Sequence, residues 1–578
     1  MRDGTKLYSE IYLPEGSEGV DRIKRPVVVI RSPYGGTGLP EGCFRSPTGA
    51  PRIGAVVVVQ SVRGTGTSQG TFTPIVQERQ DGEDTIAWAA SQPWSNGKVG
   101  MTSGSYLGMV QWQAAIGRPK GLKVITPLVM GANPFDDWIL RNGVFDIDLN
   151  HAWAQQFVGP YLRRQMVKSG AGPAEIDAAV KAHDSRAQAH KMWLETLPLA
   201  GDWDRETRKA VPFLWEQYSH PVYDAYWKKL DALAQIDKVT VPALVGASWF
   251  DYFAKGTIDS FVALTERGGS AAAREASMLT IDCCGHAPSF RIPLQPGQID
   301  WGPNRLNYLS LRDRFLSRHL LGDQNGIDSE PRVQMVVLVP PDSGTKGDTF
   351  LYKATGWPVP GTRYEEYHLS SGGRANTSAG DGVLSTTMPS QGPADVFLYD
   401  PLNPVPTIGG GATGAALDQS PVESRDDVLV YTSPPTERET LMIGRIDLSF
   451  WAQTDGRDTD YTAKLLDVHP DGFAHTIVDR IVRGRTRAGS ETRPRLLRPG
   501  RPYAYNLMLG YTGMVLRPGH RLRLELSSSN FPKYARNLNT GASNEQTAET
   551  RIARNMVFHD RLRPAILRVP VIDGPIPR

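Results

Sequence analysis

The sequence predicts an α/β domain built on a parallel sheet, a helical insertion within that domain, and an all-β domain in the C-terminal part. Three observations predict this organisation. Runs of β-branched residues alternate with helical stretches near the start, strand-like runs disappear over 131–240, and short strands rich in Gly, Pro, Ser and Thr follow from about 350. At 578 residues the chain is too long for one hydrophobic core, which agrees with several domains.

The parallel sheet is predicted from short apolar segments that lack a polar face, because such strands are buried on both sides. The predicted strands are 27–30, 55–59, 98–102, 124–125, 241–245 and 278–281. Helices are expected between them, at 76–91, 109–116 and 304–321. Residues 1–130 and 241–350 are therefore assigned to one α/β domain.

The segment 131–240 is predicted to be a helical insertion that caps the sheet, because its aromatic and charged residues recur at helical spacings. Gly-Ala-Gly-Pro at 170–173 separates two of its helices. Residues 351–578 are predicted to form a β-sandwich of the jelly-roll kind, with strands at 428–431, 461–466 and 522–526.

Composition excludes several classes of partner. The net charge is +3 from 64 basic and 61 acidic residues, and no long basic run favours nucleic acid or an anionic membrane surface. No stretch has the length of a membrane span, and three cysteines cannot build a disulfide framework. We therefore expect a cytoplasmic enzyme. A bridge between the adjacent residues Cys283 and Cys284 is not expected, because disulfides usually join Cα atoms that lie farther apart.

A candidate nucleophile lies where a predicted strand turns into a predicted helix, in the segment Val99 to Gly108. A serine on such a turn is exposed above the sheet, with the helix N-terminus directed at it. Ser105 has small residues on both sides, although Ser103 and Leu107 replace two glycines of the G-x-S-x-G pattern. Ser103 is a rival nucleophile, and a plain Ser/Gly turn is the structural alternative.

A base and an acid are expected at the ends of other parallel strands, where open α/β sheets hold their active sites. His286 follows the strand 278–281 by a short loop, and Asp251 follows the strand 241–245. Their order with Ser105 is nucleophile, acid, base, as in α/β-hydrolases. Asp282 is a competing acid, although a loop-capping role explains it as well. The predicted fold of the first domain is therefore an α/β-hydrolase catalytic domain.

These residue types imply covalent acyl transfer through a serine ester. His286 would remove the proton of Ser105 and return it to the leaving group, while Asp251 would fix the tautomer of His286. Two donors must also meet the developing oxyanion. The backbone N–H of Tyr106 is one candidate, and the loop after strand 27–30 is expected to supply the other.

The chain resembles the cocaine-esterase-like (CocE/NonD) hydrolases and their relatives, the X-Pro dipeptidyl-peptidases and α-amino-acid ester hydrolases. The resemblance covers nearly the whole length and rests on motifs in the same order: Arg2 to Leu7, Arg31 to Tyr34, Val62 to Gly70, Asp84 to Gly97, Ser105 to Gly108, Trp249 to Asp251, Ser527 to Pro532 and Asn537 to Gly541. It implies that the hydroxyl of Tyr34 serves the oxyanion hole. A homodimer is compatible with this family.

Three departures from the family pattern indicate a divergent pocket. The family usually has Gly where Ser103 stands, Gly-Pro-Trp-x-His where residues 282–286 read Asp-Cys-Cys-Gly-His, and Gln-Asp-x-Arg-Gly where residues 60–64 read Gln-Ser-Val-Arg-Gly. None of them removes a triad member. The substrates of the family are therefore not transferred directly.

The expected substrate is a small-molecule ester, or an amide, with an apolar acyl group. Aromatic residues of the insertion and the acid loop are the candidate pocket, chiefly Trp138, Trp153 and Phe253, although many such residues would form the insertion's own core. An acidic cluster that could bind a free amino terminus is available in Asp136, Asp137, Asp146 and Asp148, but a solvated helix face explains it equally well.

Several alternatives stay open from the sequence. They are an X-Pro dipeptidyl-peptidase or acylase acting on amides, an acyltransferase that uses an acceptor other than water, and a binding protein whose hydrolase domain is inactive. We predict no cofactor and no metal, because no spacing of His, Cys and Asp is typical of metal ligands.

Overall fold

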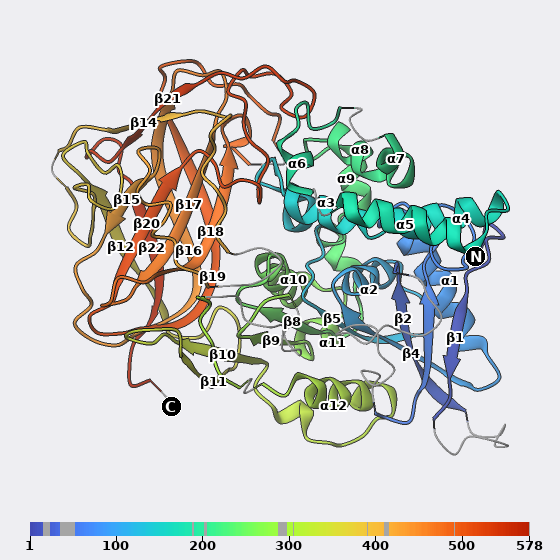
Figure 1. The fold of residues 1–578 in the computed structure, drawn as a ribbon. Helices are drawn as coiled ribbons and strands as arrows, with labels where there is room; N and C mark the ends of the chain where they lie inside the picture. Colours follow the sequence, from blue (N-terminus) through green and yellow to red (C-terminus); the bar gives the residue numbers. More distant parts are fainter. Residues whose placement is uncertain are drawn as a thin grey trace.

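The computed structural model describes residues 1–14, 24–34, 52–187, 190–201, 205–286, 297–303, 306–389, 391–409, 416–489 and 492–576. Figure 1 shows the N-terminal half, in blue to green, beside a C-terminal β-rich half, in orange and red. The segment 131–240 lies above the first half and also meets the second.

The first half is built on a mostly parallel sheet whose strands run in the order β1-β3-β2-β4-β5-β8-β9-β10, with only β1 antiparallel to its neighbour. Six of these strands, β2, β3, β4, β5, β8 and β9, fall on segments predicted from the sequence, whereas β1 and β10 were not predicted. Their bounds are β1 Ser9–Tyr12, β2 Arg25–Ser32, β3 Val56–Ser61, β4 Ser95–Gly104, β5 Leu122–Leu128, β8 Leu244–Ser248, β9 Met278–Asp282 and β10 Val333–Val339.

Helices pack against this sheet where small residues allow close approach. A Cβ on Gly82 would lie 2.8 Å from the Cβ of Ala114, so two helices touch there. A Cβ on Gly100 would meet Leu316 and Leu320 of a third helix. The helices are α1 Glu78–Ser91, α2 Tyr106–Ile116, α10 Ala254–Arg267, α11 Ala271–Glu275 and α12 Tyr308–Leu320. The three helices predicted for this domain are thus confirmed.

The segment between β5 and β8 is mainly helical, as predicted, with a short hairpin of β6 and β7 near its start. It also contacts the C-terminal half, because the N–H of Ile147 donates to the carbonyl of Lys533 over 3.1 Å. Its elements are η2 Phe135–Ile139, β6 Leu140–Arg141, β7 Val144–Phe145, α3 Ile147–Gln155, α4 Val158–Lys168, α5 Pro173–Ala187, α6 His190–Glu195, α7 Arg205–Ala210, α8 Pro212–Ser219, α9 Ala225–Leu230 and η3 Leu233–Lys238.

The C-terminal half is an all-β unit made of two antiparallel ladders. One runs β12-β22-β16-β19 and the other β18-β17-β20-β15. The ladders share a core, since Tyr461 of β17 lies 5.7 Å from Phe450 and 4.9 Å from Tyr505, between ring centroids. The strands of the two ladders are β12 Thr362–Ser370, β15 Leu429–Thr432, β16 Thr440–Thr454, β17 Asp460–Val468, β18 Ala474–Arg483, β19 Tyr503–Leu516, β20 Arg521–Ser527 and β22 Ile566–Ile572.

Strand β10 joins the two halves. It is the last parallel strand beside β9, and it also pairs with β11 (Asp348–Ala354) and, at Leu338, with β19. The backbone ladder is therefore continuous from the α/β sheet into the β-rich half. The remaining short strands, β13 Val383–Ser385, β14 Asp395–Tyr399 and β21 Ala553–Phe558, extend the two ladders.

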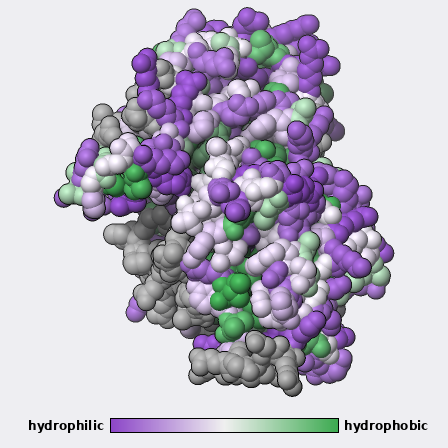
Figure 2. Space-filling view, turned by 90° about the vertical axis from the view of Figure 1, so that its right-hand side faces the viewer, coloured by the Kyte–Doolittle hydropathy of each residue, from purple (hydrophilic) through white to green (hydrophobic). Residues whose placement is uncertain are grey.

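The surface seen in Figure 2 is mainly hydrophilic, and its hydrophobic residues gather in small separate patches. Within the described part of the chain, none of the helices combines the length and the apolar character that crossing a membrane requires.

Candidate active site

Ser105 lies in a tight turn between β4 and α2. Its backbone has φ 59° and ψ −135°, a conformation that is costly for a residue with a side chain and is often found at functional sites. The turn is held by the N–H of Ser105, which donates to the carbonyl of Leu128 over 2.9 Å. Gly108 is needed one turn later, because a Cβ there would lie 3.2 Å from the same carbonyl oxygen.

His286 connects Ser105 to Asp251 through opposite nitrogens of its ring. Nε2 lies 2.8 Å from Oγ of Ser105, and Nδ1 lies 3.0 Å from Oδ2 of Asp251. The Asp251 side chain is fully buried, whereas that of His286 is 17% exposed. The other carboxylate oxygen of Asp251 accepts a hydrogen bond from the N–H of Phe253 over 2.7 Å. This arrangement orients the imidazole and leaves Nε2 in contact with the serine.

Asp282, the competing acid, and Ser103, the rival nucleophile, do not take these positions in the structure. Asp282 ends β9, and its Oδ1 accepts a hydrogen bond of 2.6 Å from the N–H of Cys283, as expected for a loop-capping carboxylate. Ser103 still belongs to β4, although its φ of 104° shows that the backbone already leaves the extended conformation there. The hydrogen bonds of His286 thus favour Ser105 and Asp251.

The loop before His286 contains a disulfide between Cys283 and Cys284, which contradicts the sequence prediction. The prediction relied on the usual Cα separation of disulfides, whereas these Cα atoms are 3.7 Å apart in a turn that brings both sulfur atoms to one side. The carbonyl of Cys284 accepts hydrogen bonds from the hydroxyl of Ser248 and from the N–H of Phe250, the latter over 3.1 Å. The loop that carries the histidine is thus fastened to the loop that carries Asp251.

Tyr34 and Tyr106, the two residues predicted for the oxyanion hole, both contact Trp153. Tyr34 follows β2, and its hydroxyl accepts a hydrogen bond from Nε1 of Trp153 over 3.2 Å. The backbone N–H of Tyr106 is at the first position of α2, immediately after Ser105. A free N–H at a helix N-terminus suits a developing negative charge.

The side chain of Tyr106 is held by a buried network that sequence reasoning missed. Its hydroxyl donates to Oε1 of Glu78 over 2.8 Å and accepts from the N–H of Ile75 over 3.0 Å. Arg31 forms an ion pair of 2.7 Å with the other oxygen of Glu78. Burial raises the pKa of the Glu78 carboxyl although Arg31 opposes this shift. The one signal in the sequence is that Arg31 is a charged residue directly after a strand predicted to be buried, where a charge needs a partner.

The three predicted pocket residues lie around the site, and all are buried. The ring of Phe253 packs edge-on against His286 at 5.3 Å, and Tyr252 lies 4.8 Å from the same ring. Trp138 packs edge-on against Trp153, with ring centroids 4.8 Å apart. Trp153 also stacks on Tyr106 at 5.7 Å. These rings therefore support the nucleophile turn and the histidine.

The acidic residues Asp136, Asp137 and Asp146 do not form a solvated helix face, contrary to one of the two interpretations. Asp137 and Asp146 are buried. Asp136 pairs with Arg480 at 2.9 Å, and Asp146 lies 3.6 Å from Arg141. Burial opposes ionisation of Asp136, but the nearby cations outweigh it and lower its pKa. The β-rich half contributes one of these cations, which the sequence alone could not reveal.

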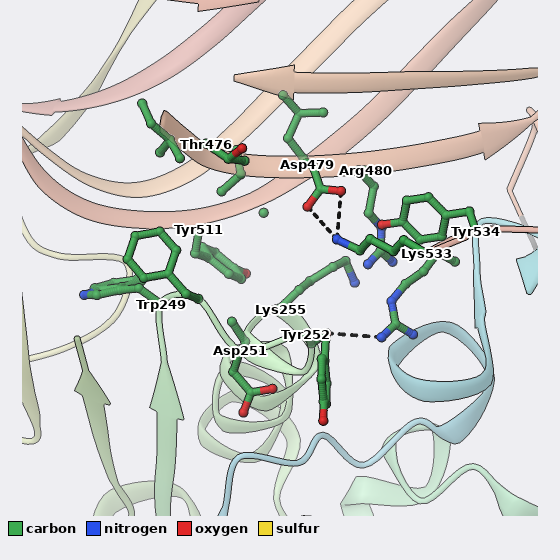
Figure 3. Close-up of a pocket in the computed structure, with 17 residues that line it drawn as sticks. Trp249, Asp251, Tyr252, Lys255, Thr476, Asp479, Arg480, Tyr511, Lys533 and Tyr534 are labelled. Atoms are coloured by element: carbon green, nitrogen blue, oxygen red, sulfur yellow. Dashed lines mark hydrogen bonds and ion pairs between the residues drawn. The ribbon is translucent and has the colours of Figure 1, made fainter. Parts of the chain in front are cut away.

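A small cavity of about 90 Å³ lies between the two halves, behind the segment 249–255 (Figure 3). Charged side chains from both halves line it, and one ion pair among them joins Lys533 to Asp479. Nζ of Lys533 lies 2.6 Å from Asp479, and Arg141 donates to the carbonyl of Tyr252 over 3.1 Å. Arg141, at the end of β6, thus helps to fix the segment that carries Asp251.

Two groups of residues in the described part of the chain bring possible metal ligands within 4.8 Å of one another. One is Asp282, Cys283 and Cys284, whose sulfur atoms are joined in the disulfide. The other is Asp467, His469 and His520 in the β-rich half, where Nδ1 of His520 lies 2.9 Å from Asp467. Neither group contains a member of the Ser105–His286–Asp251 set.

Models of two families match the chain. The X-Pro dipeptidyl-peptidase (S15 family) matches residues 3–287, and the X-Pro dipeptidyl-peptidase C-terminal non-catalytic domain matches residues 325–567. Cocaine esterase of Rhodococcus sp. (strain MB1 Bresler) is 32% identical over 99% of this chain and 97% of its own length.

Two solved structures share the fold over 99% of this chain and 95% of theirs. An aminopeptidase from a marine sediment Thaumarchaeota archaeon has a TM-score of 0.75 at 23% identity. An α-amino acid ester hydrolase has a TM-score of 0.75 at 21% identity. The first half of the chain is therefore of the α/β-hydrolase type, followed by a non-catalytic domain. The chain belongs to the cocaine-esterase-like (CocE/NonD) family of serine hydrolases, which is related to X-Pro dipeptidyl-peptidases and α-amino-acid ester hydrolases.

Proposed function

We propose that this serine hydrolase cleaves an ester acyl bond through an acyl-enzyme formed on Ser105, with His286 as the base and Asp251 as the orienting acid. The observation that carries the proposal is the bonding of His286 to Ser105 and Asp251 through its two different ring nitrogens. A histidine bonded in this way can take a proton on one nitrogen while the carboxylate stabilises the cation that results.

The reaction would proceed in two acyl-transfer steps. Oγ of Ser105 attacks the carbonyl carbon while Nε2 of His286 takes the hydroxyl proton. The tetrahedral intermediate collapses when His286 gives that proton to the leaving oxygen, which leaves the acyl group on Ser105 as an ester. Water, deprotonated by the same nitrogen, then attacks this ester, and the acid product leaves as Ser105 recovers its proton.

The negative charge of both intermediates would be stabilised by the N–H of Tyr106 and the hydroxyl of Tyr34. The first donor is supported by its position at the start of α2, directly after Ser105. The second is supported by the contact of the Tyr34 hydroxyl with Trp153, a ring that also stacks on Tyr106 beside the nucleophile. Each donor of this kind lowers the activation barrier by roughly 3–4 kcal/mol.

An ester with an apolar acyl group is favoured over a substrate with a free amino terminus. Asp136 and Asp146, two candidates for binding an ammonium group, are engaged with Arg480 and Arg141. Trp138, Trp153 and Phe253 supply apolar surface beside the proposed site. Hydrolysis of X-Pro amides, as the matched family names imply, is the second candidate, and transfer to an acceptor other than water would use the same acyl-enzyme.

The domain organisation proposed from the sequence accompanies this function. Residues 1–130 and 241–350 would form the catalytic domain, 131–240 a helical cap over the site, and 351–578 a jelly-roll-like domain. The packing of Trp153 on Tyr34 and Tyr106 supports a cap that shapes the pocket. A homodimer and a cytoplasmic location stay predictions.

Hydrolysis of matched chromogenic substrates tests the proposed function. We expect the wild type to hydrolyse p-nitrophenyl acetate and butyrate at least tenfold more efficiently than an X-Pro p-nitroanilide. Faster turnover of the anilide would move the peptidase function ahead. A folded wild type that turns over neither ester nor anilide would contradict both.

A further inference from the structure

A large hollow lies beside the proposed oxyanion hole and has no part in the mechanism described so far. Its volume is about 1060 Å³, enough for a substrate of considerable size. Its walls come from Pro33 and Tyr34, from the loop 64–72, and from helices α3 to α5 of the segment 131–240. Tyr34, the proposed oxyanion donor, lines the hollow, whereas Ser105 and His286 do not.

Tyr34 forms the boundary between the hollow and the proposed active site. Its ring stacks on Phe157 at 6.1 Å, and both rings line the hollow. Its hydroxyl bonds to Trp153, which packs on Tyr106 next to the nucleophile. Phe72 adds a third aromatic ring, 4.8 Å from Phe157. The inner wall of the hollow is thus aromatic and continuous with the rings around Ser105.

The wall that α4 contributes is cationic. Arg163, Arg164 and Lys168 line the hollow from this helix. Arg163 is exposed and forms an ion pair with Asp177 at 2.8 Å. Arg164 is half-buried, and no carboxylate or other hydrogen-bond acceptor among the described residues pairs with it. Burial lowers the pKa of Arg164, although the nearby Tyr161 opposes this shift.

Gln155, at the end of α3, is a second unpartnered group in the same lining. Only 8% of the residue is exposed. Neither its Nε2 nor its Oε1 has a hydrogen-bond partner within the described part of the chain. Burying a polar group without a partner costs about 1–3 kcal/mol. A buried amide of this kind, together with an unpaired arginine, is typical of a wall that binds a ligand.

We propose that this hollow binds a carboxylate of the substrate, so that the preferred substrates are esters or amides whose remote end carries a carboxylate on an apolar body. Arg164 would pair with the carboxylate, Gln155 would bond to it or to a neighbouring polar group, and the aromatic wall would hold the apolar body. The inference rests on the proposed function, because it assigns the remote part of the same substrate.

Matched pairs of neutral and carboxylated esters test this proposal. One pair places the carboxylate on the acyl group, as in mono-p-nitrophenyl adipate compared with p-nitrophenyl hexanoate. The other pair places it on the leaving group, as in 3-carboxy-4-nitrophenyl butyrate compared with p-nitrophenyl butyrate. Each is measured with the wild type, with Arg164→Gln and with Arg163→Gln as the control, because Arg163 is the neighbouring arginine that already has a carboxylate partner.

We expect Arg164→Gln to lower kcat/KM for the carboxylated ester of one pair about tenfold. The change should come from a higher KM, because a hydrogen bond to a charged group is lost. The neutral ester and the Arg163→Gln control should change less than twofold. The pair that responds identifies the side of the scissile bond that enters the hollow. Equal effects of Arg164→Gln on carboxylated and neutral esters in both pairs would overturn the proposal.

A second variant, Gln155→Leu, tests the proposal independently in case Arg164→Gln does not fold. Gln155→Leu removes the unpartnered amide, so we expect an unchanged or higher Tm together with a higher KM for the responsive carboxylated ester alone. A lower Tm with unchanged KM would show that Gln155 serves the fold. If the wild type hydrolyses no neutral ester, the proposed function itself fails; if it does and neither variant discriminates, only the inference about the hollow fails.

Discussion

Within the residues that the structure describes, two clusters of serine, histidine and aspartate are bonded differently. In the α/β half, Ser105 and Asp251 contact different nitrogens of His286. In the β-rich half, Ser371 and Asp395 both contact Nε2 of His559, each over 3.0 Å. Nδ1 of His559 is buried and has no hydrogen-bond partner within the described part of the chain.

The second cluster is a structural joint. The carboxylate of Asp395 accepts hydrogen bonds from the hydroxyls of Ser371 and Tyr431 and from the N–H of Ala375. Burial favours the neutral acid, but these bonds and His559 outweigh it and lower the pKa of Asp395. The hydroxyl proton of Ser371 is directed at the carboxylate of Asp395 and not at His559. The comparison teaches that a catalytic histidine must contact the serine and the aspartate through different ring nitrogens, and that the serine must lie on a turn that substrate can reach. The presence of the three residue types together does not show either condition.

Replacing the two serines gives the largest expected contrast. Ser105→Ala should lower kcat at least ~10⁴-fold, because the nucleophile is lost. Ser371→Ala should leave kcat within twofold and lower the free energy of unfolding by about 1–3 kcal/mol, since Asp395 and His559 lose a buried partner. Ester hydrolysis and urea unfolding measure the two effects. Loss of activity in a folded Ser371→Ala enzyme would contradict the assignment of Ser371 to a purely structural cluster.

Replacing the two aspartates sharpens the contrast. Asp251→Asn should lower kcat roughly 10³–10⁴-fold with little change in KM, because the amide holds His286 in the wrong tautomer. Asp395→Asn should act on stability instead, as an amide cannot accept the four hydrogen bonds of the carboxylate equally well. Ester hydrolysis kinetics and urea unfolding of both variants measure the loss of kcat and the loss of stability. Equal losses of kcat would mean that the second cluster also supports catalysis.

The positions of Ser105, Asp251 and His286 could be predicted from sequence because each follows a short apolar strand, and strand ends of a parallel sheet meet at one edge. The same logic located six of the strands and three of the helices of the first half. The cluster around Asp395 was not predictable in this way. Ser371 and His559 follow the ends of β12 and β21, and Asp395 begins β14, so His559 meets Asp395 across 164 residues. No local pattern reports which antiparallel strands are neighbours.

Removing hydroxyls near the nucleophile tests which donors face the reaction. Tyr34→Phe should lower kcat roughly 10²-fold, the usual effect of removing one oxyanion donor. Tyr106→Phe should change kcat less than fivefold, because its proposed donor is the backbone N–H. It should lower Tm, because Oε1 of Glu78 and the N–H of Ile75 lose their bonds to the hydroxyl. If Tyr106→Phe has the larger effect on kcat, the assignment of the donors is wrong.

A carboxyl without a histidine partner gives the smallest expected effect. Burial, aided by Asp259 and Asp136, raises the pKa of Asp137 to about 7. Its folded pKa exceeds the unfolded value, so the folded state binds more protons between about pH 4 and 7 and loses stability as pH rises through this range. Asp137→Asn should therefore flatten the decline of Tm between pH 5 and 8. Parallel profiles for the variant and wild type would contradict this.

Several features of the site were not predictable, and the reasons are physical. Trp153 contacts Tyr34 across 119 residues, so the rings predicted as a pocket lining turned out to be packed together beside it. Arg480 of the β-rich half neutralises Asp136, which the sequence places 344 residues away. The disulfide of Cys283 depends on a turn whose shape comes from bonds to Ser248 and Phe250. Each depends on tertiary neighbours rather than on local pattern.

Covalent labelling with a fluorophosphonate tests the central claim most directly, because the reagent reacts with a serine only where a base activates it. Intact mass and peptide mapping would locate the adduct in the wild type, Ser105→Ala and Ser371→Ala. The account predicts one adduct on Ser105 in the wild type and in Ser371→Ala, and none in Ser105→Ala. An adduct on Ser371, or a folded wild type that takes no label, would contradict it.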